Sequence, residues 1–328
     1  MTLDLLLLAV GLALLMLGGE TVVRGATGLA RDIGVSPLVI GLTVVAFGTS
    51  APEMAVNVIA VSHGRGAISF GNIMGSNMAN IGLIVGCTAL IRPIIITGIV
   101  IAREIPMMLL ATAAALVMGF DFIRGVEQGA YDRTDGLLLL MFFLVFLYYT
   151  VGDFVRRRAD NAGGRALPGL TGEAGGSVWK HALLTLFGLA ALIGGARVTV
   201  EAAVHVARAF GVPEEVIGLT VLALGTSLPE LVASIAATMR GHVELAIGNV
   251  VGSNIFNLLL VLGVTALIGV VPVPPGGQID LLIVTLFSLI LLLVSMTGNR
   301  RIIRTEAVML LFLYFGYVTW RSTQALSG

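Results

Sequence analysis

The sequence predicts an all-α membrane protein with ten transmembrane helices in two inverted-topology five-helix repeats. The composition, the number of long apolar runs and an internal repeat support this prediction. Hydrophobic residues make up 57% of the 328 residues and charged residues only 12%, whereas a soluble domain carries about 25% charged residues. So few solvating groups require that most of the surface faces lipid. The formal net charge of zero provides no basic surface for nucleic acid.

Ten apolar runs are long enough to cross the bilayer core, which takes about 20 residues per helix. The runs are 2–27, 35–61, 67–90, 94–119, 135–152, 180–207, 213–238, 244–270, 279–297 and 305–321. The polar stretch between the fifth and sixth runs is rich in glycine and charge, which is typical of a linker. We therefore expect a first five-helix repeat at 1–152, a linker loop at 153–179 and a second five-helix repeat at 180–328.

The distribution of arginine predicts the orientation. Because each half contains an odd number of spans, the two halves enter the membrane from opposite sides. Most arginines fall on the side of the linker, which contains Arg156, Arg157 and Arg158. The positive-inside rule places that side in the cytoplasm. We expect a multi-pass protein of the cell membrane with both termini outside the cytoplasm.

Two segments occur twice, and this repeat is the most informative feature of the chain. Residues 41–53 read GLTVVAFGTSAPE and residues 218–230 read GLTVLALGTSLPE. Residues 71–80 read GNIMGSNMAN and residues 248–257 read GNVVGSNIFN, at the same offset of 177 positions. Oppositely inserted, similar halves are typical of secondary transporters, whose substrate site lies near the bilayer midplane between the repeats.

The GTSxPE motif predicts a helix that breaks inside the membrane. Pro52 lacks an amide donor and clashes with the carbonyl four residues earlier, near Gly48. We expect this break to leave the carbonyls of Ala46 and Phe47 without partners in the helix. Irregular backbone at that depth is tolerated only where it faces protein or a polar cavity. The motif then adds oxygen-bearing side chains at Thr49, Ser50 and Glu53, repeated at Thr226, Ser227 and Glu230.

Two carboxylates at symmetric positions indicate a cation site. A charge at the bilayer centre costs about 3 kcal/mol on insertion scales. Glu53 and Glu230 together balance one divalent ion, and mixed oxygen ligands suit Ca2+, which takes about six to eight of them. The same oxygens can hold Na+. No His or Cys accompanies the motif, which argues against zinc or copper. In the alternative interpretation, the two acids are neutral or paired with arginine and only pack the bundle.

The GNxxGSNxxN motif contributes further polar groups. Its glycines, four residues apart, favour close helix packing. Ser76 and Asn80 lie four residues apart and share one helix face, as do Ser253 and Asn257. The remaining asparagines of the motif either bind the ion or hold the backbone of the broken helices, and the sequence leaves both possibilities open; they are Asn72, Asn77, Asn249 and Asn254.

These motifs resemble the alpha-repeats of the cation/Ca2+ exchanger (CaCA) superfamily, in its prokaryotic Na+/Ca2+ exchanger-like branch. The resemblance covers the whole chain except the linker, and it implies ten helices that work by alternating access. The ion ligands that it implies are Glu53, Glu230, Thr49, Ser50, Thr226, Ser227, Ser76, Asn80, Ser253 and Asn257, with backbone carbonyls from Ala46 and Ala223. Many relatives carry Asp at the position of Asn257.

The motifs and the resemblance together predict a secondary-active antiporter that exchanges Ca2+ for Na+, with both ions as substrates in a lipid bilayer. An H+/Ca2+ exchanger and a K+-dependent Na+/Ca2+ exchanger are the alternatives within this class, and a cation channel is the alternative from another class. An enzyme is not expected, because no His or Lys base accompanies Ser50 or Ser227. We expect no cofactor, no nucleic acid and no obligate protein partner.

Overall fold

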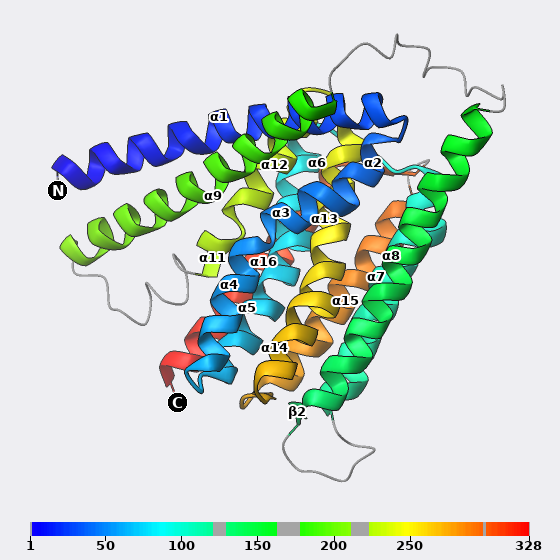
Figure 1. The fold of residues 1–328 in the computed structure, drawn as a ribbon. Coiled ribbons are helices and arrows are strands. Elements are labelled where there is room, and N and C mark those ends of the chain that lie inside the picture. Colours follow the sequence, from blue (N-terminus) through cyan, green and yellow to red (C-terminus); the bar gives the residue numbers. More distant parts are fainter. Residues whose placement is uncertain (1, 121–128, 163–177, 211–222, 298–299, 328) are drawn as a thin grey trace.

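The computed structural model describes residues 2–120, 129–162, 178–210, 223–297 and 300–327, and these are almost entirely helical (Figure 1). The helices of the first half are α1 (Thr2–Ile33), α2 (Pro37–Ile40), α3 (Ala46–Thr49), α4 (Ala51–Ser62), α5 (Gly66–Met78), α6 (Gly86–Ile91), α7 (Ile105–Phe120) and α8 (Arg133–Ala162). Those of the second half are α9 (Val178–Ala209), α11 (Ala223–Thr226), α12 (Leu228–Met239), α13 (Val243–Ile255), α14 (Leu262–Ile268), α15 (Gly277–Met296) and α16 (Arg304–Ser327).

Seven helices of the described residues are long and apolar enough to cross a membrane, and a bent pair makes an eighth candidate. The bent pair joins Pro37–Thr49 to Ala51–Ser62 at 41°. The predicted run 213–238 lies partly outside the described residues, so the count of ten spans stays a prediction. Helix α8 continues to Ala162, and the first ten residues of the predicted linker are therefore helical.

Helices α1 and α9 form an antiparallel pair that runs at a steep angle to the other long helices (Figure 1). Glycine allows their backbones to touch: a Cβ atom on Gly18 would lie 2.8 Å from the amide nitrogen of Leu192 and 3.0 Å from the carbonyl of Gly188. A Cβ atom on Gly195 would lie 3.0 Å from the carbonyl of Gly11. The pair shares a hydrophobic cluster with α2, α12 and the start of α13, distinct from the larger core around α5, α7, α15 and the rest of α13.

Two short antiparallel strand pairs tie the halves together. Strand β1 (Ile94–Ile95) pairs with β4 (Arg301–Ile302), and β2 (Ala130–Tyr131) pairs with β3 (Val271–Pro272). Strands β1 and β3 are offset by 177 positions, whereas β2 and β4 are offset by 171. The shorter offset also relates the starts of α8 and α16, at Arg133 and Arg304. The repeat thus continues to the last helix of each half, beyond the segments where the sequence shows it.

Both GTSxPE motifs interrupt a helix at their serine. Ser50 has φ −83° and ψ 3°, and Ser227 has φ −88° and ψ 3°. The proline of each motif occupies the first turn of the following helix, where its missing amide costs little. The break therefore comes at Ser50, two residues after the position near Gly48 where it was expected.

One expectation about the break is wrong. The carbonyl of Ala46 was expected to have no partner in its helix, but it accepts the amide of Ser50 at 3.0 Å. The proline acts on the next turn, so the preceding helix completes its last hydrogen bond. A carbonyl oxygen has two lone pairs, and the Ala46 carbonyl also accepts a hydrogen bond from Thr49 Oγ1 at 3.4 Å.

Glycine packing of the GNxxGSNxxN motif is confirmed for the second half. A Cβ atom on Gly248 would lie 2.6 Å from the carbonyl of Leu38, and one on Gly252 would lie 2.8 Å from the carbonyl of Leu42. The equivalent partners of Gly71 and Gly75 fall mainly in 211–222, outside the described residues. For the first half this prediction remains untested.

Candidate cation site

Each broken helix places its carboxylate in the first turn after the break. Glu53 lies at the start of α4 and Glu230 at the start of α12, and both side chains are 1% exposed. The unpaired amides at a helix N-terminus carry a partial positive charge that favours an anion. The two carboxyl groups are close enough to interact electrostatically. The fold therefore brings one buried acid from each half to a common place.

Hydroxyl groups of each half face the carboxylate of the other. Ser50 Oγ donates a hydrogen bond to Glu230 Oε1 at 3.3 Å. Thr49 also lies beside Glu230. On the other side, Thr226 of the second half lies beside Glu53, together with Ser76 of the same half as Glu53. The site is therefore shared between the halves, as the repeat predicted.

The last asparagine of each GNxxGSNxxN motif sits in a π-helical turn. The turns are η2 (Ala79–Val85), which contains Asn80, and η6 (Phe256–Val261), which contains Asn257. They begin 177 positions apart, and both asparagines are buried. Short π-helical turns occur frequently at functional sites. Sequence reasoning missed these turns, and the only signal available was a polar residue inside an apolar run.

Many buried polar atoms of these motifs have no hydrogen-bond partner among the described residues. Buried polar groups are normally satisfied, so a cluster of unsatisfied ones indicates a place where a ligand completes the set. The atoms are both carboxylate oxygens of Glu53, Oε2 of Glu230, the amide groups of Asn80 and Asn257, and the hydroxyls of Ser76, Ser227 and Ser253.

The chemistry of these atoms fits a hard cation. They are carboxylate, hydroxyl and amide oxygens, which suit Ca2+ and Na+. Within the described residues, no three His, Cys, Asp or Glu side chains lie close enough together to hold a metal ion. Neutral oxygens would therefore supply the ligands beyond the two acids. A site with two carboxylates and several neutral oxygens matches the charge of one divalent ion.

The structure shows contacts around the two acids for some of the predicted ligands and only burial for others. The contacts above bring together Thr49, Ser50, Glu53, Ser76, Thr226 and Glu230. The other four are also buried: Ser227 at the second break, Asn80 in η2, Ser253 in α13 and Asn257 in η6. Ala223 begins α11, and the residues before it are outside the described part of the chain, so its carbonyl stays a prediction.

The two remaining asparagine positions of each motif behave differently. Asn77 and Asn254 donate to carbonyls of their own helices, those of Ile73 at 2.7 Å and Val250 at 3.1 Å. Asn72 instead contacts Asn57 at 2.8 Å and Thr226 at 3.3 Å. Asn72 therefore connects the broken helix of its own half to that of the other half.

Asn249 makes the equivalent connection in the second half. Its Nδ2 donates to Ser234 Oγ at 3.0 Å and to the carbonyl of Glu230 at 3.4 Å, and its Oδ1 accepts from Thr49 Oγ1 at 3.2 Å. Of the two possibilities that the sequence left open for Asn72 and Asn249, their contacts favour holding the broken helices. Both side chains form hydrogen bonds with residues of the two broken helices.

Comparison with known proteins gives consistent results. A family model described as sodium/calcium exchanger protein matches residues 3–152 and 180–323. The sodium/calcium exchanger MaX1 of Methanosarcina acetivorans is 32% identical over 97% of this chain and 98% of its own length. The inner membrane protein YrbG of Escherichia coli is 37% identical over 88% of this chain and 85% of its own length. A structure of the sodium-calcium exchanger NCX_Mj without Na+ and Ca2+ superposes with a TM-score of 0.83 at 33% identity, covering 97% of this chain and 98% of that chain.

Proposed function

Because the chain belongs to the sodium/calcium exchanger family, we propose that this cation/Ca2+ antiporter takes Na+ as its coupling ion and exchanges it for Ca2+ by alternating access. The observation that carries the proposal is the pair Glu53 and Glu230. These acids come from opposite halves and are buried together, and the same repeated motifs carry further buried hydroxyl and amide groups that have no hydrogen-bond partner among the described residues. The name of MaX1, a relative over nearly its whole length, supports Na+ as the coupling ion.

The charge of the site explains why exchange is preferred over leak. With both acids ionised, the site carries two negative charges. One Ca2+ or two Na+ neutralise them, and a third Na+ leaves a single positive charge. Two uncompensated charges in a low-dielectric region are costly. The loaded site therefore changes its access from one side of the membrane to the other more readily than the empty site does. Transport in one direction therefore requires an ion in the other.

The α1–α9 pair is the element that suits alternating access. Its two helices touch backbone to backbone, and it has a hydrophobic cluster separate from the larger core. The pair borders both breaks, because Leu189 of α9 lies against Gly48 and Val200 of α9 lies against Gly225. Movement of the pair as one body would expose the site to one side and then the other, as in transporters built from inverted repeats.

Transport assays with defined ion gradients test the proposal. Purified protein is reconstituted into liposomes loaded with Na+, with K+, or with a proton gradient, and uptake of radiolabelled Ca2+ is measured. We expect uptake only with internal Na+. Uptake driven by the proton gradient, or a requirement for K+ in addition to Na+, would favour the corresponding alternative. Uptake without any counter-ion would favour a cation channel.

A double variant tests the site within the same assay. Glu53→Gln with Glu230→Gln removes both negative charges, and we expect it to abolish Na+-dependent Ca2+ uptake. Glu306→Gln is the matched control: Glu306 is a helix-capping acid that accepts from Thr297 Oγ1 and the amide of Ile303, away from the site. Normal uptake by the double variant would overturn the site assignment.

We also infer that both termini lie outside the cytoplasm. In support, several arginines gather at one end of the bundle: Arg304 Nε donates to the carbonyl of Leu90 at 3.2 Å, Arg92 lies against Gly241, and Arg301 belongs to the strand pair at that end. The positive-inside rule makes this the cytoplasmic end. Cysteine labelling checks the orientation. Single cysteines are introduced near Arg301 in a Cys87→Ser background and exposed to a membrane-impermeant reagent, and we expect labelling only in inverted vesicles.

A further inference from the structure

Three arginines from separate segments meet at one end of the bundle. Arg92 follows α6, Arg240 follows α12, and Arg304 begins α16. Helix α6 packs against both of the other helices. A Cβ atom on Gly241, the residue after Arg240, would lie 3.3 Å from Arg92 Nη1. Arg304 Nε donates to the carbonyl of Leu90, two residues before Arg92, at 3.2 Å. The two halves of the chain therefore place these charges on one surface.

Each of these arginines directly follows an exposed apolar side chain. Ile91 is 44% exposed, Met239 70% and Ile303 41%. We call the six residues the basic rim: Ile91, Arg92, Met239, Arg240, Ile303 and Arg304. An arginine side chain can lie along apolar surface while its guanidinium stays at the boundary with water. The basic rim thus offers apolar and cationic groups together, and a ligand that matches both is an amphipathic anion.

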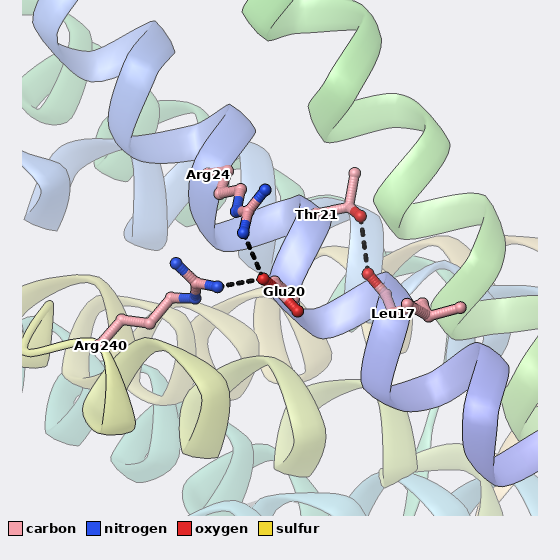
Figure 2. A network of polar contacts seen from close by, with 5 residues as sticks. All are labelled: Leu17, Glu20, Thr21, Arg24 and Arg240. Atoms are coloured by element: carbon pink, nitrogen blue, oxygen red, sulfur yellow. Dashed lines mark hydrogen bonds and ion pairs between the residues drawn. The ribbon is translucent and has the colours of Figure 1, made fainter.

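Acids close to the basic rim do not neutralise it. Glu20 is shared by Arg240 and Arg24 (Figure 2). Among the described residues, the side chain of Arg92 has no hydrogen bond or ion pair. The charged residues of the rim and of the segments beside it are Arg24, Arg92, Arg240, Arg300, Arg301 and Arg304 against Glu20, Glu244 and Glu306. The surface is therefore positively charged.

The repeat does not place a similar surface at the opposite end of the protein. Equivalent positions lie at the offset of 177 residues, or of 171 for α16. The three arginines correspond to Gly269, His63 and Arg133, and the three apolar residues correspond to Ile268, Ser62 and Asp132. The positive-inside rule accounts for an excess of arginine at one end. It does not require that arginines of both halves converge or that each follows an exposed apolar residue.

We propose that the basic rim binds the headgroup of an anionic phospholipid. A phosphodiester accepts paired hydrogen bonds from a guanidinium group, which makes arginine a strong phosphate ligand. Basic pockets between transmembrane helices bind anionic headgroups in this way. The apolar residues of the rim lie along the acyl chains. Because Arg92 belongs to the first half and the other two arginines to the second, the bound lipid links the halves. The inference does not depend on which ion is exchanged for Ca2+.

Lipid binding by the purified full-length protein in a neutral detergent tests the inference. Native mass spectrometry over a range of lipid concentrations compares phosphatidylglycerol with phosphatidylcholine, whose headgroup has no net charge. We expect the first phosphatidylglycerol molecule to bind at least about tenfold more tightly than phosphatidylcholine. It should also raise the midpoint of thermal unfolding, because a ligand of the native state stabilises it.

Inorganic phosphate separates a lipid site from a site for free phosphate. We expect that millimolar phosphate does not displace phosphatidylglycerol, because the acyl chains contribute to binding. Displacement by phosphate would overturn the lipid as the ligand.

Removing charge identifies the surface. Arg92→Gln with Arg304→Gln should weaken phosphatidylglycerol binding by about tenfold or more. Arg65→Gln with Arg133→Gln is the matched control, because it removes two exposed arginines at the opposite end, and it should bind as the unaltered protein does.

Single variants of Arg92 keep the test independent of the contact between Arg304 and Leu90. Should the double variant not fold, Arg92→Gln alone should weaken phosphatidylglycerol binding by about fivefold, and Arg92→Lys, which keeps the charge, should weaken it less. Equal affinity of the unaltered protein for the two lipids would overturn the inference. So would an equal loss of binding in the rim variant and in the control.

Discussion

Glu20 of α1 forms an ion pair with Arg240, which caps the end of α12 in the other half of the protein (Figure 2). The same carboxylate oxygen accepts from Arg24, one turn along α1, at 2.5 Å. The repeat does not preserve this arrangement, because Glu20 corresponds to Arg197 and Arg240 to His63. In the second half the order of charges is reversed, with Arg197 bound to Glu201 at 2.9 Å. The two equivalent positions, on α9 and at the end of α4, are therefore both basic and cannot form the same ion pair.

Removing this ion pair should change the relative stability of the two states in which the site opens to opposite sides of the membrane. The pair joins α1 to α12, a contact that changes if the α1–α9 pair moves, so Glu20→Gln should alter the ratio of Ca2+ uptake rates in the two directions. Exposed pairs contribute about 0.2–1 kcal/mol, which corresponds to roughly a 1.5- to 5-fold change. The measurement compares right-side-out and inverted vesicles.

Glu201→Gln is the matched control, since it removes an acid of the same kind on α9. Glu201 pairs with Arg197 within its own helix. An equal effect of the two variants would show that the contact between the halves has no special role.

The glycine contact between α1 and α9 should be sensitive to a single methyl group. In Gly18→Ala the new Cβ atom would lie 2.8 Å from the amide nitrogen of Leu192, and such overpacking costs about 1–3 kcal/mol. Gly194→Ala provides the control on α9, because no atom lies within 4 Å of its Cβ position among the described residues. There alanine should be neutral or stabilising by up to about 1 kcal/mol. The midpoint of thermal unfolding in detergent measures both effects, and a similar midpoint for both variants would contradict the prediction.

Neutralising one site acid should stabilise the ion-free protein and remove its response to Ca2+. Glu53 and Glu230 are buried close together, and an unpaired buried charge is costly. We expect Glu53→Gln to raise the free energy of unfolding by on the order of 1 kcal/mol without Ca2+. At a Ca2+ concentration of 100 times Kd, the unaltered protein gains about 2.7 kcal/mol, whereas the variant should gain little. A Ca2+-dependent shift that survives in the variant would count against the site.

Placing an acid at the last motif position should make transport sensitive to protons. Asn257 is buried in its π-helical turn, and Asn257→Asp adds a third carboxyl group to the site. A proton can then occupy that group in competition with the cation. We expect Na+-dependent Ca2+ uptake by the variant to fall more steeply than that of the unaltered protein between about pH 8 and pH 6. Parallel pH profiles would show that position 257 does not contact the ion.

Local chemistry is the reason that the sequence predicts the helix breaks and the buried acids. Proline and glycine act on the backbone within a turn of their own position, so a break near Pro52 and its repeat near Pro229 could be predicted, as could the burial of Glu53 and Glu230. The i,i+4 pair of Glu20 and Arg24 is likewise a property of one helix, and the structure contains it.

Other features depend on how separate segments pack. Arg240 as a second partner of Glu20, and the π-helical turns around Asn80 and Asn257, could not be derived from local pattern. The expectation of a free carbonyl at Ala46 was wrong, because a proline in the first turn of a helix leaves the hydrogen bonds of the preceding turn intact.

By itself, the sequence determined that this protein lies in a membrane, that its two halves are copies, and which oxygen-bearing residues each copy contributes. Hydropathy and helix breaking are properties of short segments, and a repeat can be read directly. Only the tertiary structure decided which oxygens of one half meet the acid of the other, as Ser50 meets Glu230, and which way the amides of Asn72 and Asn249 point. Hydrogen bonds have direction, and that direction is set by partners distant in the chain.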